Sequence, residues 1–269
     1  MREPTRRVEG LRREEVARLA GISAEYYLRL EQGRSRQPSE QVLAGLSKAL
    51  RLDADAAYHL RVLAFQGEMP PAALRAEDPD PATINLVHCL RDVGALLVDL
   101  NFDVVDANAL GETILPGVAA HPVNLIHEIA RRTEEPAERE RVVAEMLAVL
   151  RFLGTDRDPR RDDVVDSLTL GSPALRAAWD RHDVRRPGPF QTSLESCDIG
   201  VIPVQCQVLL LASTPHALVT VMGMNDARGR ATMRYLQTLS DERADRSGSG
   251  NLVLTDTGSV GIRRAAVLS

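Results

Sequence analysis

The residue types that could support catalysis gather near position 180. Asp180, His182 and Asp183 lie in the segment WDRHDV, and an acid beside an imidazole supplies two parts of a hydrolytic triad. Candidate nucleophiles follow at Ser193, Ser196 and Cys197. However, the sequence contains no G-x-S-x-G segment to expose a serine on a strained turn. The pattern therefore favours a helix that ends near His182, whose charge suits a helix C-terminus, and we expect no catalytic residues.

The spacing of histidine and cysteine does not favour a metal site. His121 and His127 are six residues apart, so they do not share one helical face, while His88 and Cys89 are adjacent. Because a zinc site needs three or four convergent ligands, we expect no bound metal. The sequence also has no glycine-rich phosphate loop after a strand, so we expect no nucleotide cofactor.

Positive charge is concentrated in the first part of the chain. Residues 1–52 contain 11 basic and 7 acidic side chains, a net charge of +4, whereas the whole chain carries −5. The remaining residues therefore carry −9. This asymmetry is typical of a nucleic-acid-binding module joined to an acidic second domain. With 269 residues, 44% of them hydrophobic, the chain is long enough for two globular domains.

The basic segment has the pattern of two short helices joined by a tight turn. In REEVARLAG, Val16, Leu19 and Ala20 recur at helical spacing, and Gly21 ends the helix. Ser23 can cap the second helix. Two helices separated by such a turn form a helix-turn-helix, whose second helix enters the major groove of DNA with its N-terminal end.

Two further helices complete an expected all-α bundle over residues 1–65. The first follows Ser39 in EQVLAGLSKAL, with Leu50 on its inward face. The second covers about 53–65, with Leu63 on its inward face. Short helices with connections of a few residues predict a compact bundle.

The sequence RREEVARLAGIS...YYLRLEQGR resembles the XRE-type (lambda-repressor-like) helix-turn-helix family. The matching positions are Val16, Ala17, Gly21, Leu30, Glu31 and Gly33. The resemblance implies that the second helix contacts base edges, where arginine binds guanine and glutamate accepts from cytosine, and that flanking arginines hold phosphates. The implied DNA-binding set is Arg12, Arg13, Ser23, Ala24, Glu25, Tyr26, Arg29, Arg34 and Arg36. We expect Glu31 to make a structural hydrogen bond or an ion pair inside the bundle and Tyr27 to lie in the core.

A wider resemblance covers about residues 10–240. GLRREEVARLAGIS-x-x-YY-x-RLEQGR, followed by PS-x-x-VL and HLRVLA, is similar to the MmyB-like transcriptional regulators common in actinobacteria. VDLNFDVVDAN, NLIHEIARR and SPALRAAWDRHDV resemble a hairpin, a helix and a signature of their second domain. The resemblance implies an α+β, PAS-like fold with an antiparallel sheet and a fatty-acid-like ligand. Where the family commonly has a histidine-proline pair, this chain has ESCDIG at 195–200, which predicts a reshaped, smaller or lost pocket.

The remaining segments predict a linker, a second domain and a tail. Prolines and glycine interrupt residues 66–82, which we assign to a linker between the domains. We place the second domain at 83–240 and a mobile tail at 241–269. The expected elements of the second domain are a helix over 83–93, two strands around Asn101–Asp103, helices over 122–132, 136–153, 160–169 and 172–182, three strands between 188 and 225, and a helix over 227–239.

Residues 199–225 carry no charge over 27 positions, which is long enough to cross a membrane. Polar residues and Pro203 and Pro215 interrupt the stretch, so two buried strands explain it better than a helix.

The three cysteines form no C-x-x-C pair, and MREPTRRVEG has no apolar run behind it. We therefore expect no disulfides, no signal peptide and a cytoplasmic location.

These observations predict a DNA-binding transcriptional regulator that acts as a homodimer on an operator. Its C-terminal domain is expected to sense a small apolar, fatty-acid-like ligand. The candidate ligand-binding residues are Trp179, Arg181, His182, Cys206 and Met222. Two alternatives remain open: a C-terminal domain that binds other proteins without a ligand, and an enzyme of acyl or ester chemistry.

Overall fold

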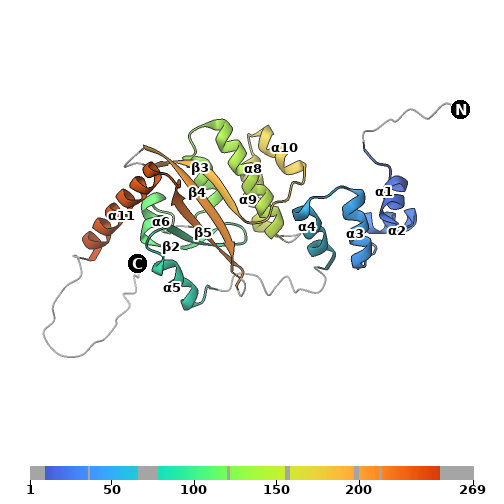
Figure 1. Ribbon diagram of the computed structural model, residues 1–269, viewed down its shortest axis with the longest axis horizontal. Helices are drawn as coiled ribbons and strands as arrows, with labels where there is room; N and C mark the ends of the chain where they lie inside the picture. The colour runs from blue at the N-terminus through green and yellow to red at the C-terminus, as the bar shows by residue number, and fades with distance from the viewer. Residues whose placement is uncertain are drawn as a thin grey trace.

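A computed structural model of the chain describes residues 10–35, 37–65, 78–119, 122–154, 158–196, 200–211 and 214–248. A bundle of short helices lies at one end of the molecule, and a twisted sheet with helices around it forms the other part (Figure 1). The predicted order of an all-α domain followed by an α+β domain is confirmed.

The N-terminal bundle contains α1 (Arg13–Ala20), α2 (Ala24–Glu31), α3 (Glu40–Ala49) and α4 (Ala54–Phe65). Gly21 ends α1 in the left-handed conformation, with φ 72°, which glycine adopts without steric cost. The Ser23 hydroxyl caps α2 by accepting a hydrogen bond from the Tyr26 N–H at 3.1 Å. These local signals begin and end the helices where the sequence predicts.

The inward face of α1 differs from the predicted one. Val16, Ala17 and Ala20 are buried, whereas Leu19 is 54% exposed. Helix α3 approaches α1 so closely at Gly45 that a Cβ there would overlap the Ala20 carbonyl. This close approach explains why the small residues of α1, and not Leu19, face α3. Two other residues expected inside the bundle are also exposed, Leu50 and Leu63.

In the described part of the chain, the C-terminal sheet has five strands in the order β2-β1-β5-β4-β3, and every neighbouring pair is antiparallel. The strands are β1 (Gly94–Asp99), β2 (Val104–Ala107), β3 (Pro189–Ser196), β4 (Gly200–Leu210) and β5 (His216–Gly223). The uncharged stretch at 199–225 thus supplies the paired strands β4 and β5. Among the described ranges, no helix combines the length and the apolar character needed to cross a bilayer.

Helices surround this sheet: α5 (Pro81–Cys89), α6 (Ala109–Ile114), α7 (Leu125–Arg132), α8 (Pro136–Leu153), α9 (Pro159–Thr169), α10 (Pro173–Asp180) and α11 (Ala227–Gly248). The main core joins the inward residues of β4 to α6, α7, α8 and α11. Helix α5 packs on a smaller cluster with β1 and β5. The sequence did not predict α6, and α11 extends beyond the predicted end at 239 because good helix formers such as Glu242 and Arg243 continue it.

Asn108 ties the start of α6 to the sheet. Its side-chain oxygen accepts from the N–H groups of Ala95 at 2.9 Å and Gly111 at 2.7 Å. Its amide group donates to the carbonyls of Leu90 and Val93. Because the residue is only 3% exposed, water cannot readily replace these partners.

The outer edge of β3 is covered by side chains of α8. Among the residues that the structure describes, strand β3 pairs with β4 on one side only. On its other side, Arg141 donates to the Gln191 carbonyl at 2.9 Å. Glu138 accepts from the Ser193 N–H at 2.7 Å. Backbone groups that an edge strand usually leaves open therefore have partners here.

Candidate DNA-binding helix and ligand cavity

The N-terminal end of α2 is exposed, as a DNA-reading helix requires. Ala24, Glu25 and Arg29 are exposed, and Tyr26 is half-buried. Ser23 is the N-cap residue of α2. The first turn of α2 therefore presents side chains of different chemistry on one accessible surface.

Arg29 makes a weak, exposed ion pair in the free protein. Its guanidinium lies 3.4 Å from the Glu25 carboxylate one turn earlier, and both side chains are more than half exposed. Exposed pairs of this kind contribute about 0.3–0.5 kcal/mol. A guanine edge can therefore compete with Glu25 for Arg29.

The flanking arginines differ in their surroundings. Arg12 and Arg34 are exposed, whereas Arg13 pairs with Glu31 at 2.6 Å. Arg36 lies outside the described residues. Glu31 makes an ion pair as expected, but at the exposed surface of the bundle and not inside it. Tyr27 is partly buried against the bundle core, and burial and the nearby Glu31 raise the pKa of its hydroxyl.

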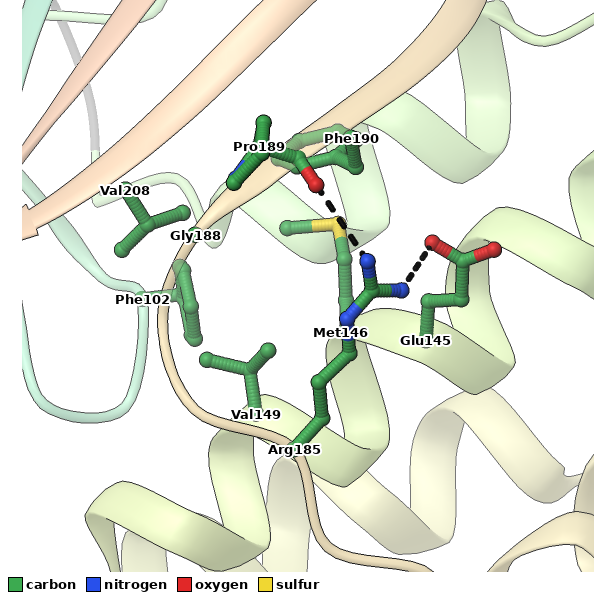
Figure 2. Close-up of a pocket in the computed structure, with 9 residues that line it drawn as sticks. All are labelled: Phe102, Glu145, Met146, Val149, Arg185, Gly188, Pro189, Phe190 and Val208. Carbon is green, nitrogen blue, oxygen red and sulfur yellow. Dashed lines mark hydrogen bonds and ion pairs between the residues drawn. The ribbon is translucent and has the colours of Figure 1, made fainter. Parts of the chain in front are cut away.

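A small cavity lies inside the C-terminal domain, between α8, β4 and the chain that leads into β3 (Figure 2). Its volume is about 10 Å³, which corresponds to about one water molecule. Seven of its nine lining residues carry no charge: Phe102, Met146, Val149, Gly188, Pro189, Phe190 and Val208. The other two, Glu145 and Arg185, are ionisable. The cavity is thus an apolar space with the Arg185–Glu145 ion pair beside it, and Glu145 also pairs with Arg141 of α8 at 2.8 Å.

The ion pair of the cavity is well defined. Arg185 lies 2.6 Å from the Glu145 carboxylate and also donates to the Pro189 carbonyl at 3.3 Å. Figure 2 shows the guanidinium between these two acceptors. Both side chains are partly exposed, so an anion that enters from solvent can reach Arg185.

The five predicted ligand-binding residues do not come together at this cavity. Trp179 stacks against Arg151, whose guanidinium lies 3.6 Å from the ring centroid. Arg181 and His182 are exposed at the end of α10, where His182 has φ 57°. Cys206 is fully buried, and burial raises the pKa of its thiol to about 12. Met222 is half-buried on β5, and none of the five lines the cavity.

Sequence reasoning missed Arg185 and Glu145. A usable signal is present in RRPGPF, where two arginines precede a proline-glycine-proline entry into a strand. Such a segment cannot continue a helix, so its side chains must lie on a connection. Glu145 has no comparable signal, because it is one of several charged residues on α8.

The structure brings together a serine and a histidine that the sequence did not pair. His127 Nε2 lies 2.7 Å from the Ser167 hydroxyl, and His127 Nδ1 lies 3.3 Å from Asn124. Ser167 sits within α9 and donates to the Val164 carbonyl, so it is not on an exposed turn of the kind that presents a nucleophile. Within the described residues, no group of three or more His, Cys, Asp and Glu side chains could hold a metal ion.

Comparison with known families identifies both parts of the chain. A helix-turn-helix domain family matches residues 3–60, which makes the N-terminal part a DNA-binding domain of that class. The ligand-binding domain of MmyB-like transcription regulators matches residues 79–239, more than half of the chain. The chain therefore belongs to the MmyB-like transcription regulators, and its two domains are those of a DNA-binding regulator. No curated protein matches the chain.

Proposed function

We propose that the protein is a sequence-specific transcriptional regulator that binds its operator as a homodimer and responds to a small apolar anion such as a fatty acid. The exposed first turn of α2 carries the DNA-binding part of this proposal. One helix-turn-helix covers few base pairs, so two copies on half-sites about 34 Å apart are needed for specific affinity. We place this activity in the cytoplasm.

The α2 surface supports two kinds of contact with DNA. Arg29, together with Glu25 and Tyr26, is proposed to read base edges, because these residues lie in the first turns of α2 and are exposed or half-buried. Arg12 and Arg34 are exposed near the two ends of the α1–α2 unit and are proposed to bind phosphates. Base contacts provide specificity, whereas phosphate contacts provide affinity for any DNA.

Replacing Arg34 by alanine should weaken binding to the operator and to random DNA alike. Each phosphate contact that is lost lowers the slope of log K against log salt by about 0.9. Fluorescence anisotropy titrations at several salt concentrations measure this slope for both DNAs. Arg181→Ala is the matched control, because Arg181 is an exposed arginine of the other domain. A loss confined to the operator would assign Arg34 to base reading instead.

The cavity supports the ligand part of the proposal. Apolar side chains from α8 and β4 surround it, and Arg185 supplies a positive charge at its edge. Ligand pockets are commonly apolar with a few placed polar groups. A carboxylate can replace Glu145 as the partner of Arg185, while Met146, whose side chain is flexible, moves to admit the hydrocarbon chain.

Decanoate and longer fatty acids should raise the melting temperature of the protein. A ligand that binds only the folded form stabilises it by RT ln(1 + [L]/Kd), about 2.7 kcal/mol at 100 times Kd. Val149→Phe should remove this shift by filling the cavity. Val105→Phe is the control, because Val105 is exposed on β2. If no chain length shifts the wild-type protein, the ligand-free interaction module replaces the sensor.

A further inference from the structure

Two consecutive arginines between α10 and β3 contact different domains. Arg185 lines the cavity and pairs with Glu145 on α8. Arg186 contacts α4 of the DNA-binding bundle, where its Nε lies 2.8 Å from Asp55 Oδ1. A single peptide bond therefore joins the residue beside the cavity to the residue that holds the DNA-binding domain.

Arg186 is fixed to α4 by its backbone as well as its side chain. Its backbone N–H donates to Asp55 Oδ2 at 3.0 Å. Its guanidinium also donates to the Ala54 carbonyl at 3.3 Å and lies 4.9 Å from the centroid of the Tyr58 ring. Because Asp55 binds both the main chain and the side chain, the contact fixes the path of the connection itself.

Helix α8 takes part in both the cavity and the domain contact. Tyr58 of α4 stacks on Phe152 with ring centroids 5.4 Å apart and an angle of 14° between the planes. Phe152 lies three residues after Val149, which lines the cavity, and residues at this spacing share one side of a helix. The Arg185 N–H also donates to the Ala148 carbonyl at 3.2 Å. One turn of α8 thus contacts the cavity, the segment between α10 and β3, and the DNA-binding bundle.

The sequence of the connection makes it stiff. Arg186 precedes Pro187, which restricts Arg186 to extended backbone, and Pro189 has a fixed φ. Successive side chains of an extended chain point to opposite sides, which agrees with the separate partners of Arg185 and Arg186. The Gly188 carbonyl accepts from the Val208 N–H at 3.2 Å. A displacement of Arg185 is therefore passed on to Arg186.

We propose that ligand entry into the cavity releases the DNA-binding bundle from the C-terminal domain through Arg185 and Arg186. This inference rests on the proposed ligand function. The cavity has room for about one water molecule, so an anionic ligand enters only as Arg185 leaves Glu145 and pairs with the ligand. This movement draws the connection away from α8, and Arg186 then loses Asp55 and Tyr58. The bundle is held in one orientation without ligand. With ligand it keeps the Tyr58–Phe152 stack but loses the Arg186 contacts that fix its orientation, so it can reorient.

Interdomain distances in the full chain test this coupling. Spin labels are placed on cysteines that replace Lys48 and Arg234, which are exposed on α3 and α11, with Cys89 and Cys197 changed to serine. Cys206 stays unlabelled because its buried thiol has a pKa of about 12. The unliganded protein should give one narrow distance distribution by pulsed electron paramagnetic resonance. Arg186→Gln, which removes the guanidinium contacts with Asp55, Ala54 and Tyr58, should broaden it.

Arg185→Met and Val149→Phe decide whether the cavity controls the contact. Arg185→Met removes the ion pair with Glu145. Val149→Phe fills the cavity while Arg185 and Arg186 keep their side chains. Both variants should therefore broaden the distance distribution. Arg181→Met is the matched control and should leave it narrow, because Arg181 pairs with Asp183 in solvent. Thermal unfolding confirms that each variant is folded. A distribution that stays narrow in both cavity variants overturns the coupling.

Decanoate separates the coupling from the ligand proposal. In the wild-type protein it should broaden the distribution. Arg186→Gln should bind decanoate about 5- to 150-fold more tightly, because ligand entry no longer has to break the guanidinium contacts with α4. If decanoate binds but the distribution stays narrow and the affinity is unchanged in Arg186→Gln, the coupling is wrong. If decanoate does not bind while both cavity variants broaden the distribution, the fatty-acid ligand is wrong and the coupling stands.

Discussion

Replacing Asn108 by alanine is expected to lower the free energy of unfolding of the C-terminal domain by about 3–5 kcal/mol, because each buried group left without a partner costs about 1–3 kcal/mol. The substitution leaves the N–H groups of Ala95 and Gly111 and the carbonyls of Leu90 and Val93 without their side-chain partner. Whole domains are stable by only about 5–15 kcal/mol. This one residue therefore accounts for a large part of the stability.

Urea denaturation followed by circular dichroism measures the effect of Asn108→Ala. Asn225→Ala is the matched control, because Asn225 is exposed and changes at such sites are usually within about 0.5 kcal/mol of neutral. If both variants unfold at the same urea concentration as the wild-type protein, the hydrogen bonds of Asn108 do not stabilise the domain.

Arg29→Ala is expected to weaken binding to the operator by about 1–3 kcal/mol, or roughly 5- to 150-fold in Kd, because one bidentate contact to guanine is lost. Affinity for random DNA should change much less. The preference at one base pair of the operator should also relax. In the wild-type protein, Arg29 must leave its exposed ion pair with Glu25 to reach guanine. Breaking this pair costs less than the guanine contact contributes, so the substitution should still weaken operator binding.

The measurement for Arg29→Ala requires the operator, which genome-wide mapping of bound DNA supplies. Titrations then compare the operator, single-base variants of it and random DNA. Arg18→Ala serves as the control, since Arg18 is exposed in the last turn of α1. An equal loss on operator and random DNA would show that Arg29 binds phosphate and does not read a base.

The elements with strong local signals could be predicted from the sequence. Helix α8 occupies 136–153 as predicted, because Pro136 favours its first turn and Gly154 follows its last residue. The helix-turn-helix follows from Gly21 and Ser23 in the same way. By contrast, α6 has only six residues and no amphipathic repeat, so its pattern was too short to recognise.

The cavity beside Arg185 could not be predicted because its walls are distant in sequence. Phe102, Val149 and Val208 meet only when the sheet and α8 have packed together. The segment WDRHDV favoured His182 as a ligand-binding residue, but α10 ends just before this residue and leaves it in solvent. Leu19 was misplaced for a similar reason, because the contact between Gly45 and Ala20 decides which side of α1 is inward.

The covered edge of β3 limits how two copies of the chain can associate. A free edge strand can recruit a strand from another molecule and extend the sheet across both. Arg141 and Glu138 already occupy the Gln191 carbonyl and the Ser193 N–H, so such an extension at β3 would first have to break both contacts. The same contacts hinder edge-to-edge pairing of folded copies at β3. If the proposed homodimer forms, it is therefore expected to use side-chain surfaces and not a shared sheet at β3.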